Sequence, residues 1–161
     1  MSIRKIAVFV LFLAMTGGAA RADVGLGIFL GQPTGFDAKI GIDNRSGIDL
    51  LLGWDTYQDS GHSDYAHVTY LLTPFVGRGR SVLVPFRIGL GLAVYDAYYY
   101  RNQFGDGLNA AVRLPIELGL RFRSVPLEIY GELALRVNFV RADDRYHRSY
   151  LDGGIGIRFY L

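Results

Sequence analysis

The sequence contains no cysteine, two methionines and three histidines among its 161 residues. The absence of cysteine excludes a disulfide-stapled scaffold, a cysteine-based zinc site and a thiol nucleophile. Hydrophobic residues nevertheless make up 50% of the chain, which is too large a share for a disordered protein. The chain therefore has the length and the apolar content of one folded domain.

Long hydrophobic runs are also missing, except at the amino terminus. There Arg4 and Lys5 precede the apolar residues 6–15, and Ala20-Arg21-Ala22 supplies the small residues of a cleavage site. The apolar run is shorter than the roughly 18–20 residues that a spanning helix needs, and this combination is typical of a secretory signal peptide. We expect residues 1–22 to be cleaved and residues 23–161 to form the mature domain.

A basic surface is absent once that segment is removed. Loss of Arg4, Lys5 and Arg21 leaves fourteen basic against fifteen acidic residues, a net charge of −1. No basic patch with interleaved aromatic residues remains, so the sequence gives no sign of a nucleic-acid partner.

The mature chain shows alternation with a period of two along most of its length. In residues 127–139 every odd position is apolar or glycine, while Glu128, Glu132, Arg136 and Asn138 occupy even positions. Such alternation is typical of strands with two different faces. It predicts eight strands, at residues 24–30, 36–43, 48–57, 65–76, 82–95, 108–122, 127–139 and 150–161.

The predicted connections alternate in length. Tight turns lie at residues 44–47, 77–80 and 123–126. Longer polar connections lie at residues 58–64, 96–107 and 142–149, and the short first connection, at residues 31–35, lies on the long-loop side. An even number of strands with short turns at one end is the layout of a bacterial outer-membrane barrel. We therefore predict an all-β fold, an eight-stranded antiparallel up-and-down transmembrane β-barrel.

Alternation by itself also fits a soluble barrel with an apolar interior, so the content of each face matters. One face carries no charged residue in any predicted strand, and its aromatic residues, apart from the mid-strand Tyr70, lie mostly near the strand ends. Aromatic girdles around an aliphatic band are a feature of barrels in membranes. The predicted membrane-interface aromatics are Phe36, Trp54, Phe86, Phe122, Phe139 and Phe159.

The other face mixes charges with glycine. An eight-stranded barrel has an interior that side chains just fill, and small residues there make room for long charged ones. Asp43 and Asp55 also fall on this face, and we expect Arg113, Glu117, Glu132 and Arg136 to pair with one another. The predicted lumen charge network consists of Asp37, Lys39, Asp49, Arg87, Arg113, Glu117, Arg121, Glu128, Glu132, Arg136, Asp152 and Arg158.

The carboxyl terminus is apolar at every second position, from Ile155 through Ile157 and Phe159 to Leu161. This pattern resembles the terminal signal that the outer-membrane barrel-assembly machinery reads, although the usual final residue is Phe and here it is Leu161. The expected partners are therefore this machinery during insertion and the lipid of the outer membrane afterwards.

Several segments together resemble a family of small outer-membrane barrels of unknown function. They are Gly31-Gln32-Pro33-Thr34-Gly35, Ile48-Asp49-Leu50-Leu51-Leu52-Gly53-Trp54, Pro85-Phe86-Arg87-Ile88-Gly89-Leu90-Gly91, Val112-Arg113-Leu114-Pro115, Leu127-Glu128-Ile129-Tyr130-Gly131-Glu132 and Gly153-Gly154-Ile155-Gly156-Ile157-Arg158-Phe159. The resemblance implies an eight-stranded barrel with an outer-membrane address. It implies no activity and no cofactor.

The histidines offer little chemistry. His62-Ser63-Asp64 contains the residue types of a hydrolase triad, but neighbours in an extended segment cannot converge on one another. His67 is expected to join the lumen network beside Asp55. His147 lies in the last loop, yet the His-x-Ser-Asn-Ala segment of lipid A deacylases is absent. We predict no catalytic residue, no cofactor and no metal site.

Pro115 lies in the middle of a predicted strand, where it removes one hydrogen bond of the ladder. Leu114 and Ile116 keep the same alternation on either side. We therefore expect a local defect in the ladder and no change of face.

The longest loop carries Tyr98, Tyr99, Tyr100 and Arg101, and the last loop carries Asp143, Asp144 and Arg145. Tyrosine and arginine are enriched at binding hot spots and also at membrane interfaces. If an extracellular ligand exists, we expect these loops to contact it. The sequence favours a structural or surface-interaction role in the outer membrane. The alternatives are a narrow gated pore, a lipid A-modifying enzyme and a soluble periplasmic ligand-binding barrel.

Overall fold

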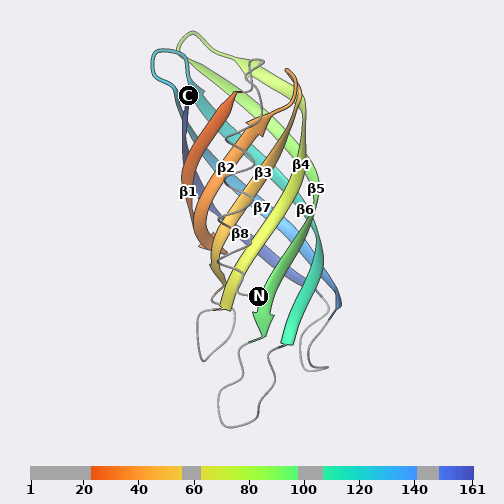
Figure 1. The fold of residues 1–161 in the computed structure, drawn as a ribbon. Helices are drawn as coiled ribbons and strands as arrows, with labels where there is room; N and C mark the ends of the chain where they lie inside the picture. Colours follow the sequence, from red (N-terminus) through yellow and green to blue (C-terminus); the bar gives the residue numbers. More distant parts are fainter. Residues whose placement is uncertain (1–22, 56–62, 98–106, 141–148) are drawn as a thin grey trace.

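The computed structural model describes residues 23–55, 63–97, 107–140 and 149–161, so the predicted signal peptide lies outside the described residues. These residues form one closed barrel in which every strand pairs antiparallel with its neighbours and β1 pairs with β8 (Figure 1). The strands are β1 (Val24–Gln32), β2 (Thr34–Gly41), β3 (Ser46–Asp55), β4 (Ser63–Arg78), β5 (Val82–Ala97), β6 (Gly107–Phe122), β7 (Leu127–Val140) and β8 (Ser149–Tyr160). The predicted eight-stranded fold is confirmed.

Both ends of the described chain lie at the same end of the barrel as the three short turns, the upper end in Figure 1. There the backbone N–H of Gly41 donates to the carbonyl of Asp23 at 3.1 Å, and that of Leu161 donates to Val24 at 2.9 Å. We call this the short-turn end and the opposite one the long-loop end. The connection from β1 to β2 lies at the long-loop end, where Gly31 has a φ of 155° that favours glycine.

The strands place their apolar side chains outside and their charges inside. Leu118 on β6 is 55% exposed, whereas the adjacent Glu117 is fully buried. This arrangement, with apolar side chains outside and charges inside, holds around the whole barrel, since every strand exposes large apolar side chains. Examples from β1 to β8 in order are Leu26, Phe36, Trp54, Val68, Leu90, Leu118, Leu133 and Ile155.

Two irregularities separate this barrel from an ideal one. The β4–β5 register shifts between Leu72 and Phe75, so the outward position changes from even to odd numbers and Phe75 is 64% exposed. Pro115 faces the interior opposite Ala134, and the β5–β6 pairing is interrupted there but resumes in the same register. The expected local defect at Pro115 without a change of face is therefore confirmed.

Asp43 was predicted on the charged face of a strand, and this is wrong. The strand β2 ends at Gly41, and Asp43 lies in the exposed turn that follows. Its carboxylate accepts hydrogen bonds from the backbone N–H of Arg45 at 2.7 Å and of Ser46 at 2.8 Å. These bonds, that of Arg45 foremost, hold the pKa of Asp43 below its usual value. Among the described residues no helix is long and apolar enough to cross a membrane.

Candidate functional site

The interior of the barrel is the candidate site because the chemistry of the chain is concentrated there. All twelve charged residues predicted for the lumen point inward, eleven of them are buried, and Arg121 is partly exposed. Glycines facing them supply the space. The ring of Tyr130 lies over Gly156, and the carboxylate of Glu128 lies over Gly119, at positions that a Cβ atom would occupy.

Arg158, from β8, holds the middle of the lumen together. Its guanidinium donates to Asp37, to Asp49 at 2.6 Å and to Glu117 at 2.9 Å. Its Cζ lies 3.7 Å from the centre of the Tyr130 ring, and the Tyr130 hydroxyl donates to Asp37 at 2.7 Å. One fully buried cation thus joins three carboxylates from three other strands with good geometry, as a buried ion pair requires.

Arg87, from β5, extends this network toward the short-turn end. It donates to Glu117 and to Glu128, the latter through both terminal nitrogens. The hydroxyl of Tyr160 donates to Glu128 at 2.6 Å. Since Glu117 binds both Arg87 and Arg158, the two guanidiniums belong to one network.

Strand β4 contributes polar side chains to the same interior. His67 Nε2 lies 3.2 Å from Asp49 Oδ2. Arg113 binds Glu132, with a second contact at 3.4 Å, and lies 3.5 Å from the Thr69 hydroxyl. The expected pair of Arg113 with Glu132 is therefore present, whereas His67 contacts Asp49 instead of the expected Asp55.

Arg136 is the buried cation nearest the long-loop end. Its Nη1 lies 2.7 Å from Asp55 Oδ2, and its Nε lies 3.4 Å from Asp152 Oδ2. Among the described residues, aromatic faces also surround its guanidinium. The rings around its Cζ belong to Tyr95 at 4.5 Å, Tyr150 at 5.0 Å and Tyr65 at 5.4 Å. Arg136 was expected to pair with Glu117 or Glu132, and the structure places it beside Asp55 and Asp152 instead.

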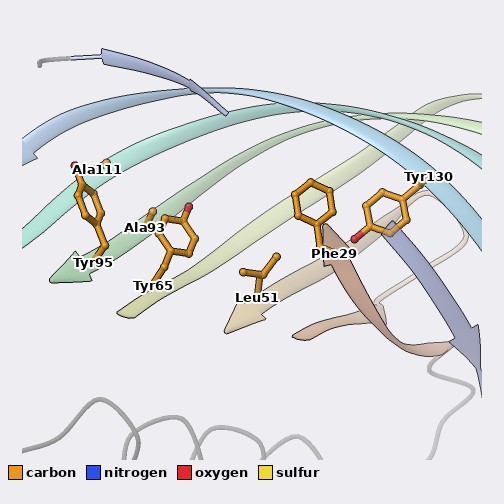
Figure 2. Close-up of a cluster of buried hydrophobic side chains, with 7 residues drawn as sticks. All are labelled: Phe29, Leu51, Tyr65, Ala93, Tyr95, Ala111 and Tyr130. Atoms are coloured by element: carbon orange, nitrogen blue, oxygen red, sulfur yellow. The ribbon is translucent and has the colours of Figure 1, made fainter. Parts of the chain in front are cut away.

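An apolar and aromatic cluster fills the lumen beside these charges. Figure 2 shows Tyr65 next to Tyr95, and Phe29 next to Tyr130. The ring centres of the first pair lie 6.2 Å apart and those of the second 5.8 Å apart. The cluster consists of Phe29, Leu51, Tyr65, Ala93, Tyr95, Ala111 and Tyr130. These inward residues were not predicted as a cluster, although the alternation that placed the charges also places them.

The short-turn end of the lumen is more open. Arg121 binds Asp23, with one contact at 2.8 Å, and its Cζ lies 3.9 Å from the centre of the Tyr160 ring. Lys39 is only 8% exposed, and among the described residues it forms no ion pair. A vestibule of about 1020 Å³ begins here, and both Lys39 and Arg121 line it.

The predicted membrane-interface aromatics all lie on strands, but their side chains differ in how much they are exposed on the outer face. Four of them are 39% to 71% exposed, namely Phe36, Trp54, Phe139 and Phe159. Phe86 and Phe122 are only partly exposed. Sequence analysis missed Phe75, because the bulge in β4 changes its face. Its outward position could not be read from alternation alone.

The predicted ligand-contacting loop residues Tyr98, Tyr99, Tyr100 and Arg101 lie outside the described residues, as do Asp143, Asp144 and Arg145. His62 and His147 also lie outside them. Ser63 is buried and Asp64 is exposed, so these neighbours point to opposite sides of β4 and do not converge. No cluster of metal-binding side chains occurs within the four described ranges.

Neither a search of family models nor a search of curated proteins finds a match. Solved structures do match. The chain is similar to the N-terminal β-barrel domain of Pseudomonas aeruginosa OprF, with 11% identity and a TM-score of 0.60, over 87% of this chain and 96% of that one. It is also similar to the outer membrane enzyme PagL, with 15% identity and a TM-score of 0.52, over 86% of this chain and 99% of that one. At these identities the similarity shows a shared fold.

Proposed function

We propose that this protein is an integral barrel of the bacterial outer membrane, with a structural or surface-interaction role and a lumen closed by its own side chains. The observation that carries the proposal is the inversion of the two faces. Leu133 is 60% exposed between the buried Glu132 and Ala134. A soluble barrel would turn its apolar side chains inward, and a continuous apolar surface of this extent marks contact with a membrane or a protein.

The aromatic residues support a lipid environment in particular. Phe36 and Phe139 are strongly exposed toward the long-loop end, and Phe75 and Phe159 toward the short-turn end. Aromatic side chains at both ends of an aliphatic belt suit the two interfaces of a bilayer. Of the two similar solved structures, PagL is described as an outer membrane enzyme, and the OprF domain is described as a β-barrel.

The network across the lumen argues against a wide pore. Arg158 reaches Asp37 on β2, Asp49 on β3 and Glu117 on β6, so its contacts cross the lumen. An eight-stranded barrel leaves an interior that side chains fill. Enzymatic function has support only from the fold shared with PagL, and a shared fold does not by itself carry activity.

Cell fractionation tests the membrane assignment. We expect the protein in the outer-membrane fraction, resistant to carbonate extraction, and migrating differently on a gel before and after boiling, because a closed barrel stays folded in detergent. A protein that is soluble in the periplasm without detergent would contradict the proposal.

Planar-bilayer recording tests the closed lumen. We expect no large stable openings from the purified protein, because charged and aromatic side chains occupy the interior. Long-lived openings of porin size would overturn the closed-lumen part of the proposal while leaving the membrane assignment intact.

A further inference from the structure

The vestibule at the short-turn end is a large opening into the lumen that described residues form. Four parts of the chain surround it: the end of β2 with the β2–β3 turn, the paired ends of β4 and β5, the end of β6 with the turn that follows, and the two ends of the described chain at Asp23 and Tyr160. Its volume of about 1020 Å³ matches the largest sites for small molecules. The vestibule is distinct from the filled middle of the lumen, so it can hold a solute where the network cannot.

The charge of its lining is strongly unequal. Six cationic side chains line it, against the two carboxylates of Asp23 and Asp43. The cationic residues are Lys39, Arg45, Arg78, Arg87, Arg121 and Arg123. A concave surface with low-dielectric walls and one sign of charge focuses the field and concentrates ions of the opposite sign.

Most of these cations have no carboxylate of their own. Arg87 binds Glu117 and Glu128, and Arg121 binds Asp23. The remaining four form no ion pair with any residue that the structure describes. They are Lys39, Arg45, Arg78 and Arg123.

Lys39 is the strongest single indication. Its side chain is more than nine-tenths buried, yet it lines the vestibule and has no ion-pair partner within the described chain. The nearby carboxylates of Glu117 and Glu128 are already bound by Arg87. Burial of most of this side chain with no carboxylate within ion-pair distance is costly, and an anion in the vestibule would supply that partner.

We propose that this vestibule binds a multivalent oxyanion, a molecule that carries two or more phosphate groups, with Lys39 at the inner end and Arg45, Arg78 and Arg123 around the rim. Guanidinium groups match the oxygens of phosphate through paired hydrogen bonds, and an ammonium binds them as a point charge. Several separated cations favour an anion with several charged groups over a single one. This site goes beyond the membrane role, and it does not depend on it.

Titration calorimetry of the folded protein in zwitterionic detergent, with inorganic tripolyphosphate as the probe, tests the proposal. We expect saturable binding that weakens as salt rises. Lys39→Gln is expected to weaken it about tenfold, in line with the loss of one charge-assisted hydrogen bond. Arg123→Gln, at the exposed rim, is expected to weaken it about threefold.

Arg80→Gln is the matched control. Arg80 lies in the same turn region as Arg78, is exposed, and does not line the vestibule. The Arg80→Gln substitution should leave tripolyphosphate binding unchanged. Gel migration before boiling verifies that each variant is folded. Absence of saturable binding to the wild type would overturn the proposal. So would Lys39→Gln and Arg123→Gln variants that bind like the wild type, or an Arg80→Gln variant that loses as much affinity as Arg123→Gln.

The phosphate groups could come from a soluble molecule or from phospholipid headgroups. Repeating the titration in micelles doped with cardiolipin, a lipid whose headgroup carries two phosphates, separates these sources. If the lipid leaves the affinity for tripolyphosphate unchanged, the result supports a soluble ligand. If the lipid weakens tripolyphosphate binding to the wild type but not to Lys39→Gln, the headgroup occupies the same site. If the lipid weakens binding equally in both proteins, it binds elsewhere, and this would contradict the headgroup source.

Discussion

The middle of the lumen and its long-loop end each hold a buried arginine, but they stabilise it in different ways. Arg158 is fully buried and binds three carboxylates, with a single tyrosine ring beneath it. Within the described part of the chain, Arg136 has two carboxylates nearby and three tyrosine rings around it. The comparison shows that a narrow barrel can hold cations by full ionic pairing at its centre and by aromatic faces toward an opening.

The largest expected effect comes from removing the central cation. Arg158→Met leaves Asp37, Asp49 and Glu117 without the guanidinium that joins them in a water-poor interior. We expect a loss of about 5 kcal/mol in the free energy of unfolding, the upper range for a broken buried ion pair. Urea unfolding in lipid vesicles measures it. A loss below about 1 kcal/mol would show that the central network does not hold the barrel together.

The matching change at the long-loop end should cost less. Arg136→Met keeps an apolar side chain whose sulfur packs well against tyrosine rings, and Asp55 lies at the very end of β3. We expect a loss of about 3 kcal/mol, at the lower end for a buried pair. The same urea titration applies. Equal losses for Arg136→Met and Arg158→Met would remove the distinction between the two regions.

Two tyrosine hydroxyls provide a finer comparison. The Tyr130 hydroxyl donates to the Asp37 carboxylate at 2.7 Å, and the Tyr95 hydroxyl donates to the Asn138 side chain at 2.8 Å. Hydrogen bonds to charged groups contribute more, so Tyr130→Phe should lose about 2 kcal/mol and Tyr95→Phe about 1 kcal/mol. A double-mutant cycle of each tyrosine with its acceptor isolates the pair energies. The reverse order would contradict the ionic character of the centre.

Alternation along the chain was sufficient for the strands and for their two faces. It placed every charge of the predicted lumen network inside the barrel, because side chains on a strand point alternately to the two faces. It failed at Phe75, where one bulge in β4 exchanges the faces. A bulge leaves no trace in the pattern when the residues around it, here Thr73 and Pro74, are neither charged nor strongly apolar.

Only some partners of the charges could be predicted from neighbouring strands. Arg87 lies opposite its partner Glu117 in the β5–β6 ladder, and Arg113 binds Glu132 on the next strand. Along the β6–β7 ladder, Arg113 lies opposite Arg136 and Glu117 lies opposite Glu132, so neighbouring positions bring like charges together. Partners on more distant strands relieve part of this repulsion, and Arg158 reaches Glu117 from β8. Such contacts depend on how the closed barrel brings distant strands face to face, which no local pattern records.

The direction of the apolar face is the central claim, and the absence of cysteine allows a direct test of it. A nitroxide label attached to Leu118→Cys should report high collision rates with oxygen and low rates with a water-soluble nickel complex in lipid vesicles. The same label at Val125→Cys, in the exposed β6–β7 turn, should report the reverse. Equal access of the nickel complex to both labels would show that the apolar belt faces water, and would contradict the account.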